Sequence, residues 1–178
     1  QVTAEATPHH FTLTDEALEN FDTNLKVNPP IRSSVDLTAI QQGLADGTID
    51  AIATDHAPHS TIEKDVEFDY AAFGMIGLET AFPLTMRLVD QGLLSPLEAI
   101  EKLTSNPARI IGVDLGRLTP GLPADVTLID PNREFTVDVN QFRSKSRNSP
   151  FQGWQLRGKT VMVLRDGKII FIEKNTSG

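Results

Sequence analysis

The stretch IDAIATDHAPH, residues 49–59, joins an apolar run to a cluster of polar side chains. The run 49–53 is typical of a buried strand. Asp55, His56 and His59 follow it directly, with one proline between the two histidines. In α/β folds, functional side chains gather where parallel strands end. The stretch therefore predicts an α/β protein with a functional site after this strand.

Helical patterns lie on both sides of the strand and favour βα units with a parallel sheet. Thr14 and Ser33 are expected to cap two helices, and the second helix should end at Gly47. Ser95 begins a capping box with proline at the first helical position. An acidic loop is expected over roughly 61–70.

Further along the chain, a helix is expected over about 78–90, with its proline at a kink or in the first turn. From about residue 112 the pattern changes to short β-rich runs separated by glycine and proline. Asp166-Gly167 lies between two apolar runs and predicts a hairpin. We expect βα units over residues 1–113 and a β-rich domain with a short tail over 114–178, the tail being KNTSG.

Composition excludes several classes of protein. The chain has 178 residues, a net charge of -8 and no cysteine, so disulfides and thiolate metal sites are ruled out. The acidic balance argues against nucleic acid or an anionic membrane as partner, and no apolar run reaches the length of a membrane span. A cysteine-free chain without a signal-peptide pattern is expected in the cytoplasm.

The chain starts at Gln1 and its first methionine is Met75, which trimming or loss of a preceding segment would explain.

Asp55 is the main candidate for chemistry. A carboxylate at a strand end can bind a metal or act as a general base on metal-bound water; the alternative is a turn or N-cap aspartate. His59 is a candidate substrate or metal ligand, with a surface loop histidine as the alternative. His56 is expected to have a structural hydrogen-bonding role, because its side chain should point away from that of Asp55.

Other candidates lie in separate segments. His9 and His10 follow a Thr-Pro turn, and structural use is the favoured interpretation. His9, Asp55 and His59 together would supply the three mixed ligands of a catalytic zinc, but no HxH or HExxH pair supports such a site. Asn28 precedes a double proline that stiffens its loop.

The Asn28 loop suits recognition of a polar ring or a carboxylate, and Arg32 on the same loop favours an acidic substrate. An ordinary turn asparagine is the alternative. Gly74 follows Phe73 and would allow backbone groups to approach a ligand closely. An ordinary loop glycine is the alternative.

Seven stretches, in order and over nearly the whole chain, resemble the bacterial-type dihydroorotases of the amidohydrolase superfamily. They are AEATPHHF (4–11), KVNPPIR (26–32), DAIATDHAPH (50–59), FGMIGLET (73–80), TSNPARI (104–110), GRLTPGLPADVTLID (116–130) and KSRNSPFQGWQLRGK (145–159). The combination of TDHAPH with KVNPPIR separates this family from hydantoinases and allantoinases, which share the aspartate.

The resemblance implies the C-terminal part of a (β/α)₈ TIM-type metal-dependent hydrolase barrel with a small β-sandwich domain. It implies reversible cyclisation of N-carbamoyl-L-aspartate to (S)-dihydroorotate, in pyrimidine biosynthesis, with zinc as cofactor. Asp55 resembles the last metal ligand and the catalytic acid/base. Asn28 and His59 resemble substrate contacts, and Phe73-Gly74 resembles the segment whose backbone binds the pyrimidine ring.

The sequence departs from the family pattern at its start. The family's HxHxR motif, bridging carboxylate and two further histidine ligands have no counterpart here, and a (β/α)₈ barrel takes about 250 residues. We expect a fragment that binds little metal, is inactive by itself and needs a missing N-terminal portion as partner.

Three further expectations accompany the fragment interpretation. Open strand edges favour association, for example as a homo-oligomer. The alternatives in function are a sister hydantoinase or allantoinase, and a non-catalytic partner of aspartate transcarbamoylase. Retention of Asp55 and His59 favours catalysis over the non-catalytic alternative.

Overall fold

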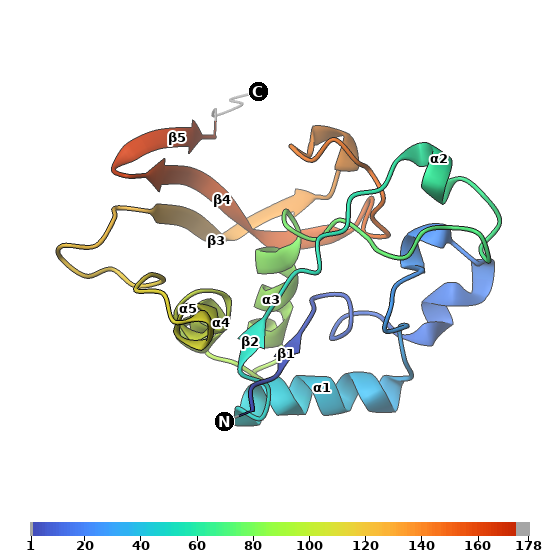
Figure 1. Ribbon diagram of the computed structural model, residues 1–178, viewed down its shortest axis with the longest axis horizontal. Coiled ribbons are helices and arrows are strands. Elements are labelled where there is room, and N and C mark those ends of the chain that lie inside the picture. Colours follow the sequence, from blue (N-terminus) through green and yellow to red (C-terminus); the bar gives the residue numbers. More distant parts are fainter. Residues whose placement is uncertain (1, 174–178) are drawn as a thin grey trace.

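The structure is a computed structural model that describes residues 2–173, so the predicted tail over 174–178 lies outside it. The described residues form two small sheets, with helices between and beside them (Figure 1). None of the helices within residues 2–173 has the length and apolar composition needed to span a lipid bilayer.

The first sheet consists of two parallel strands. β1 (Glu5–Ala6) pairs with β2 (Ala51–Ile52) in the register Glu5 with Ala51. Parallel strands need a long crossover, which here contains η1 (Asp15–Asn20), η2 (Thr23–Leu25) and α1 (Ser34–Asp46). The α/β fold class is therefore confirmed, although β2 covers less of the predicted run 49–53 than expected.

Two of the three predicted N-caps are confirmed. The Ser33 side chain accepts a hydrogen bond from the Asp36 N–H, and α1 ends at Gly47, whose φ is 84°. Ser95 forms the predicted capping box at the start of α4 (Pro96–Leu103). The predicted helix start at Thr14 is confirmed in position, but the helix that follows, η1, is a 3-10 helix and the Thr14 side chain makes no cap hydrogen bond.

Three further helices follow the first sheet. α2 (Thr61–Lys64) is a single turn within the segment 61–70 that was expected to be a loop. α3 (Ala81–Asp90) has its proline in the first turn, where no backbone N–H is required. α5 (Ser105–Ile111) follows α4 and packs against it.

The C-terminal region is β-rich, as predicted. β3 (Val126–Thr136), β4 (Gln155–Arg165) and β5 (Lys168–Ile172) form an antiparallel sheet in that order, and η3 (Val139–Gln141) lies between the first two. Asp166 and Gly167 connect β4 to β5 with φ angles of 49° and 73°. Two left-handed residues suit the right-handed twist of a hairpin, so this turn prediction is confirmed.

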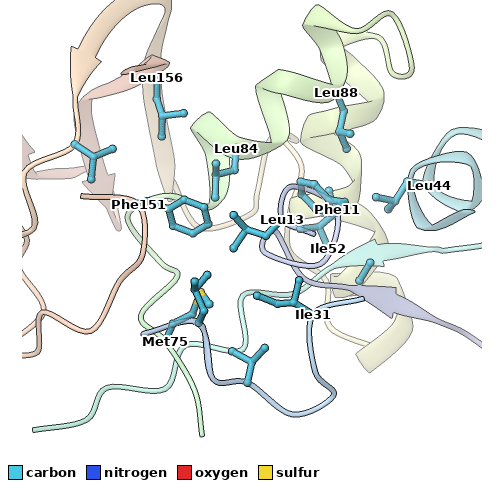
Figure 2. Packing of buried hydrophobic residues seen from close by; sticks show 14 of the residues in the cluster. Phe11, Leu13, Ile31, Leu44, Ile52, Met75, Leu84, Leu88, Phe151 and Leu156 are labelled. Carbon is cyan, nitrogen blue, oxygen red and sulfur yellow. The ribbon is translucent and has the colours of Figure 1, made fainter. Parts of the chain in front are cut away.

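One hydrophobic core joins the parallel strands to the C-terminal region (Figure 2). Phe151 packs with the same cluster as Phe11, Leu44, Leu84 and Leu88. Its ring is 1% exposed, although it belongs to an irregular segment between η3 and β4. Burial of this ring holds the neighbouring residues of the segment against the loops that follow β2.

Candidate functional site

Asp55 lies three residues after the end of β2, and its side chain is exposed. Its φ is 45°, in the left-handed region that residues other than glycine adopt infrequently. Strain of this kind is of the order of 1 kcal/mol and is concentrated at functional sites. The N-cap of the next helix, α2, is Ser60. The N-cap alternative for Asp55 is therefore wrong.

His56 has the structural role that was predicted for it. It forms an isolated parallel bridge with Met75. Its Nδ1 accepts hydrogen bonds from the N–H groups of Gly77 at 3.1 Å and Leu78 at 3.3 Å. The side chain of His56 thus connects the ATDHAPH loop to the segment before α3.

His59 is held by protein groups on every polar atom of its ring. Nε2 lies 2.9 Å from the carbonyl oxygen of Phe73, and Nδ1 lies 3.5 Å from a carboxylate oxygen of Glu63. Because a carbonyl oxygen only accepts, Nε2 carries the proton. The contact brings together two of the predicted substrate residues, His59 and Phe73, which the sequence alone could not show.

Glu63 is ionised beside His59. The N–H of Ser60 and then its hydroxyl donate hydrogen bonds to Glu63, and together with the smaller effect of the neighbouring His59 they lower the pKa of Glu63 to about 2. The capping box of α2 therefore fixes a negative charge four residues after the histidine. The Ser-x-x-Glu pattern at residues 60–63 is the sequence signal that would have predicted this helix.

Gly74 occupies a position that requires glycine. Its φ is 122°, and a Cβ here would overlap the Cβ of Ala57 and lie 3.4 Å from Nε2 of His59. The Gly74 N–H donates to the carbonyl oxygen of Lys26 at 2.8 Å. Gly74 thus lies against the ATDHAPH loop on one side and against the segment that leads to Asn28 on the other.

Asn28 is exposed, and its peptide bond to Pro29 is cis. The carbonyl oxygen of Pro29 lies 2.9 Å from Nε2 of His10, whose Nδ1 lies 2.6 Å from the hydroxyl of Thr7. Since the carbonyl accepts, His10 donates through Nε2 and accepts from Thr7 through Nδ1. The predicted structural use of His10 is confirmed, because this imidazole fixes the Asn28 loop.

His9 is buried, with 2% of its surface exposed. Burial, and to a smaller extent the neighbouring His10, lower the pKa of His9 to about 3. Its Nε2 has no hydrogen-bond partner within residues 2–173. The imidazole is therefore neutral at physiological pH.

The donor set within residues 2–173 does not fit a complete zinc site. Among the residues that the structure describes, no group of three histidine, aspartate or glutamate side chains could hold a metal ion. His9, Asp55 and His59 in particular do not form such a group. Catalytic zinc needs three protein ligands, so no metal-dependent step can be derived from these residues alone.

A cleft of about 690 Å³ lies beside α2. Five residues of the segment 59–65 line one part of it, His59 and Lys64 among them, and the segments 22–24 and 145–148 line the rest. Its volume is in the range of small-molecule sites. Of the predicted site residues only His59 lines this cleft, so the cleft adjoins the proposed site without enclosing it.

Lys64 and Asn148 are two site residues that sequence reasoning missed. Each side chain is polar, yet each residue is only 5% exposed. Asn148 lies in the stretch 145–159 that carries part of the family resemblance, and Lys64 lies within the acidic segment 61–70 that was expected to be a loop. Their partners are 8 to 91 residues away in sequence. Most of these contacts leave no local pattern.

The sequence profile of the amidohydrolase family matches residues 3–170. A dihydroorotase from Syntrophus aciditrophicus (strain SB) is 53% identical over 173 residues, which are 97% of this chain and 41% of that protein. A dihydroorotase from Syntrophobacter fumaroxidans (strain DSM 10017 / MPOB) is 56% identical over 170 residues, 96% of this chain and 39% of that protein.

Solved structures give the same picture of the fold. The L-hydantoinase (dihydropyrimidinase) from Arthrobacter aurescens superimposes with a TM-score of 0.91 at 29% identity, over 98% of this chain and 40% of that chain. The present chain therefore spans about 40% of the length of the curated relatives that it matches.

Proposed function

The chain belongs to the amidohydrolase family, and from this membership we propose that it supplies the C-terminal part of a dihydroorotase. The reaction would be the reversible cyclisation of N-carbamoyl-L-aspartate to (S)-dihydroorotate, in pyrimidine biosynthesis. The observation that carries the proposal is that the Phe73-Gly74 backbone is hydrogen-bonded both to the ATDHAPH loop and to the segment 26–28.

Asp55 is the proposed catalytic residue. Its exposed carboxylate, on a strained loop after β2, would accept a proton from the attacking water during ring opening and deliver it to the amide nitrogen that leaves. In the direction of cyclisation the same carboxylate would carry the proton the other way. Asp55 is also the proposed metal ligand. Zinc is the proposed cofactor, and its other ligands would come from an N-terminal portion.

Substrate contacts are proposed for Asn28, His59, Phe73 and Gly74. Two contacts within the protein support this proposal, because they fix three of these residues: Nε2 of His59 bonds the Phe73 carbonyl, and Gly74 lies against Ala57. Phe73 itself is 57% exposed, with the Lys26 ammonium 4.5 Å from its ring centroid. A fixed segment of backbone beside an exposed aromatic ring is suited to bind a flat polar ring.

The proposal extends to fold and partners. Residues 1–113 would belong to a (β/α)₈ barrel, and residues 114–178 to a small β-sandwich domain that other parts of the polypeptide complete. The partners would be the N-terminal portion and a second copy of the enzyme or aspartate transcarbamoylase, and the compartment would be the cytoplasm.

A sister cyclic amidohydrolase is the second candidate, and the L-hydantoinase likeness favours it. A panel of dihydroorotate, hydantoin, dihydrouracil and allantoin, offered to the complete enzyme, separates the two. Ring opening of dihydroorotate at the highest kcat/KM supports the first proposal. A preference for a substrate that lacks the carboxylate would replace it by the second.

Replacement of Asp55 tests its catalytic role. In the complete enzyme we expect Asp55→Asn to lower kcat by about 10²- to 10⁴-fold, the usual contribution of a general acid/base. Asparagine keeps the shape of the side chain and tolerates a positive φ. Steady-state assay of dihydroorotate hydrolysis measures the loss, and metal analysis reports whether zinc is retained.

Asp166→Asn is the matched control, because Asp166 also has a left-handed φ, 49°, but lies in the β4–β5 hairpin. Its kcat should equal that of the unmodified enzyme. Full activity of Asp55→Asn would contradict the catalytic assignment.

A further inference from the structure

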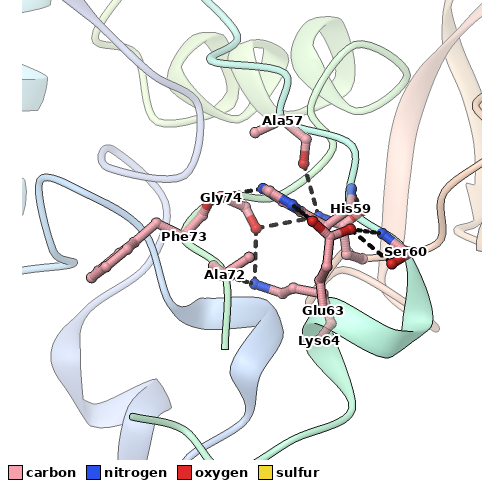
Figure 3. A network of polar contacts seen from close by, with 9 residues as sticks. Ala57, His59, Ser60, Glu63, Lys64, Ala72, Phe73 and Gly74 are labelled. Atoms are coloured by element: carbon pink, nitrogen blue, oxygen red, sulfur yellow. Dashed lines mark hydrogen bonds and ion pairs between the residues drawn. The ribbon is translucent and has the colours of Figure 1, made fainter. Parts of the chain in front are cut away.

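The carbonyl oxygen of Gly74 accepts hydrogen bonds from two buried side chains (Figure 3). The ammonium group of Lys64 lies 3.0 Å from it, and the side-chain amide of Asn148 lies 3.2 Å from it. A carbonyl oxygen has two lone pairs. Both are used here, so the peptide group after Gly74 is fixed in orientation.

Lys64 also donates to the carbonyl oxygen of Ala72, at 2.8 Å. The carbonyl between them, that of Phe73, bonds to His59. Three consecutive carbonyl groups therefore point at named donors: two at Lys64 and one at His59. Figure 3 shows these donors gathered around the segment from Ala72 to Gly74.

The burial of Lys64 is costly for a purely structural residue. Burial lowers its pKa, and its hydrogen bonds go to carbonyl oxygens. A buried ammonium group without a bonded carboxylate loses much of its hydration energy. What Lys64 provides in return is a pair of hydrogen bonds to the carbonyl oxygens of Ala72 and Gly74, which an apolar side chain of similar length could not make.

Asn148 uses its whole side-chain amide in the same place. Its Nδ2 donates to the carbonyl oxygen of Ala57 at 2.9 Å, and its Oδ1 accepts from the N–H of His59 at 3.2 Å. Its own carbonyl accepts from the N–H of Ile76 at 3.0 Å. One residue from the C-terminal region thus joins the ATDHAPH loop to the segment around Gly74.

We propose that Lys64 and Asn148 are positioning residues that together set the Phe73-Gly74 backbone against His59 for substrate binding. The inference rests on the proposed function, since it concerns the same site. Neither residue is assigned contact with substrate. Asp55 is outside this set of hydrogen bonds, so loss of either donor should weaken binding more than it slows the chemical step.

Lys64→Met in the complete enzyme is the first test. We expect KM for dihydroorotate to rise about 10- to 100-fold, the effect of a misplaced binding group, while kcat changes by less than about threefold. Lys102→Met is the matched control, because Lys102 is also buried and donates to the carbonyl of Ile49 at 2.7 Å, outside this site. Equal KM changes in the two variants would refute the positioning role.

Asn148→Asp is the second test. It keeps the acceptor for the His59 N–H but removes the donors to Ala57 and Gly74, and its KM should rise by a similar factor. Asn106→Asp is its control, since the side-chain amide of Asn106 also donates to a backbone carbonyl, that of Asp50 at 2.9 Å, but outside this site. Its KM should stay close to that of the unmodified enzyme. Because Lys64 and Asn148 act on one carbonyl, the double variant should raise KM by less than the product of the single effects. A rise in KM equal to the product of the two single effects would contradict the proposal that the two residues act together on the Gly74 carbonyl.

Hydrogen exchange separates failure of this inference from failure of the proposed function. The amide of Gly74, bonded to Lys26, should exchange at least about tenfold faster in Lys64→Met and unchanged in Lys102→Met. If the unmodified enzyme does not act on dihydroorotate, the proposed function fails, and this difference in exchange still supports the positioning of the backbone. Equal exchange in all variants would refute the inference whatever the activity.

Discussion

Gly74 combines a φ of 122° with a Cβ position that Ala57 already occupies. In Gly74→Ala, we expect the loop around Ala57 and His59 to move, which should lower the free energy of unfolding by about 2–3 kcal/mol and raise KM. Chemical denaturation and steady-state kinetics of the complete enzyme measure the two effects.

Gly92→Ala is the control for backbone strain alone. Gly92 also has a positive φ, 72°, but no atom lies within 4 Å of its Cβ position. Its alanine variant should lose about 1 kcal/mol and keep its KM. If Gly74→Ala matched Gly92→Ala in both stability and activity, the expected effect of the overlap with Ala57 would be refuted.

His9 should make stability depend on pH. Burial lowers the pKa of His9 from its usual 6.5 to about 3. Between these two pH values the unfolded chain binds a proton that the folded chain does not, so the free energy of unfolding should rise with pH by about 1.4 kcal/mol per unit at most. Above about pH 7 this contribution is complete and constant.

Urea unfolding of the unmodified enzyme and of His9→Gln, between pH 4 and 8, checks this. Carboxylates titrate equally in both proteins, so the difference between the two curves isolates His9. That difference should change with pH below 6.5 and be flat above it. Parallel curves throughout would mean that the imidazole is protonated as readily in the folded protein as in the unfolded one.

At the scale of elements, two N-caps and one hairpin turn were predictable because their signals lie within four residues. Ser33 and Ser95 were identified as N-caps, and the Asp166-Gly167 hairpin was identified from two residues. Thr14 has the residue type of an N-cap, but the backbone that follows is a 3-10 helix. In η1 no buried residue anchors a longer helix. The type and length of this helix therefore depend on packing rather than on the helix propensity of its residues.

Ser95→Ala tests the capping contribution. The Ser95 hydroxyl accepts from the Glu98 N–H at 3.3 Å, so its loss should cost about 1 kcal/mol in the free energy of unfolding. Thr14→Ala is the control, since the Thr14 side chain makes no cap hydrogen bond, and its change should be within about 0.5 kcal/mol. Denaturant titration measures both, and equal losses would contradict the assignment of the cap.

At the scale of the whole molecule, the site depends on contacts that no local pattern reveals. The sequence indicated Asp55, and it indicated His56 and His59 through one short loop. It did not reveal that His59 is bonded to Phe73, or that Asn148 bonds Ala57 across 91 residues. Long-range pairs of this kind follow from packing of the core, which a single sequence does not specify residue by residue.

Phe151 is one of the residues through which the C-terminal region packs into the shared core. Its ring is buried and meets Trp154 edge to face, with centroids 5.1 Å apart. We expect Phe151→Ala to lower the free energy of unfolding by about 3–5 kcal/mol. Ile170→Ala, at a residue 60% exposed on β5, should change it by less than about 0.5 kcal/mol. Denaturant unfolding distinguishes them, and similar losses would count against one shared core.

The contacts of Asn148 also set an order of events during protein synthesis. Asn148 follows Ala57 by 91 residues and Gly74 by 74 residues. At about 5–20 residues per second, a ribosome needs roughly 5–18 seconds to travel from Ala57 to Asn148. The ATDHAPH loop emerges from the ribosome earlier than Asn148 by the same interval, and until then it lacks the side chain that fixes it. Synonymous codons that slow translation between these residues would lengthen the interval in which the nascent loop is open to proteases, without any change in the finished protein.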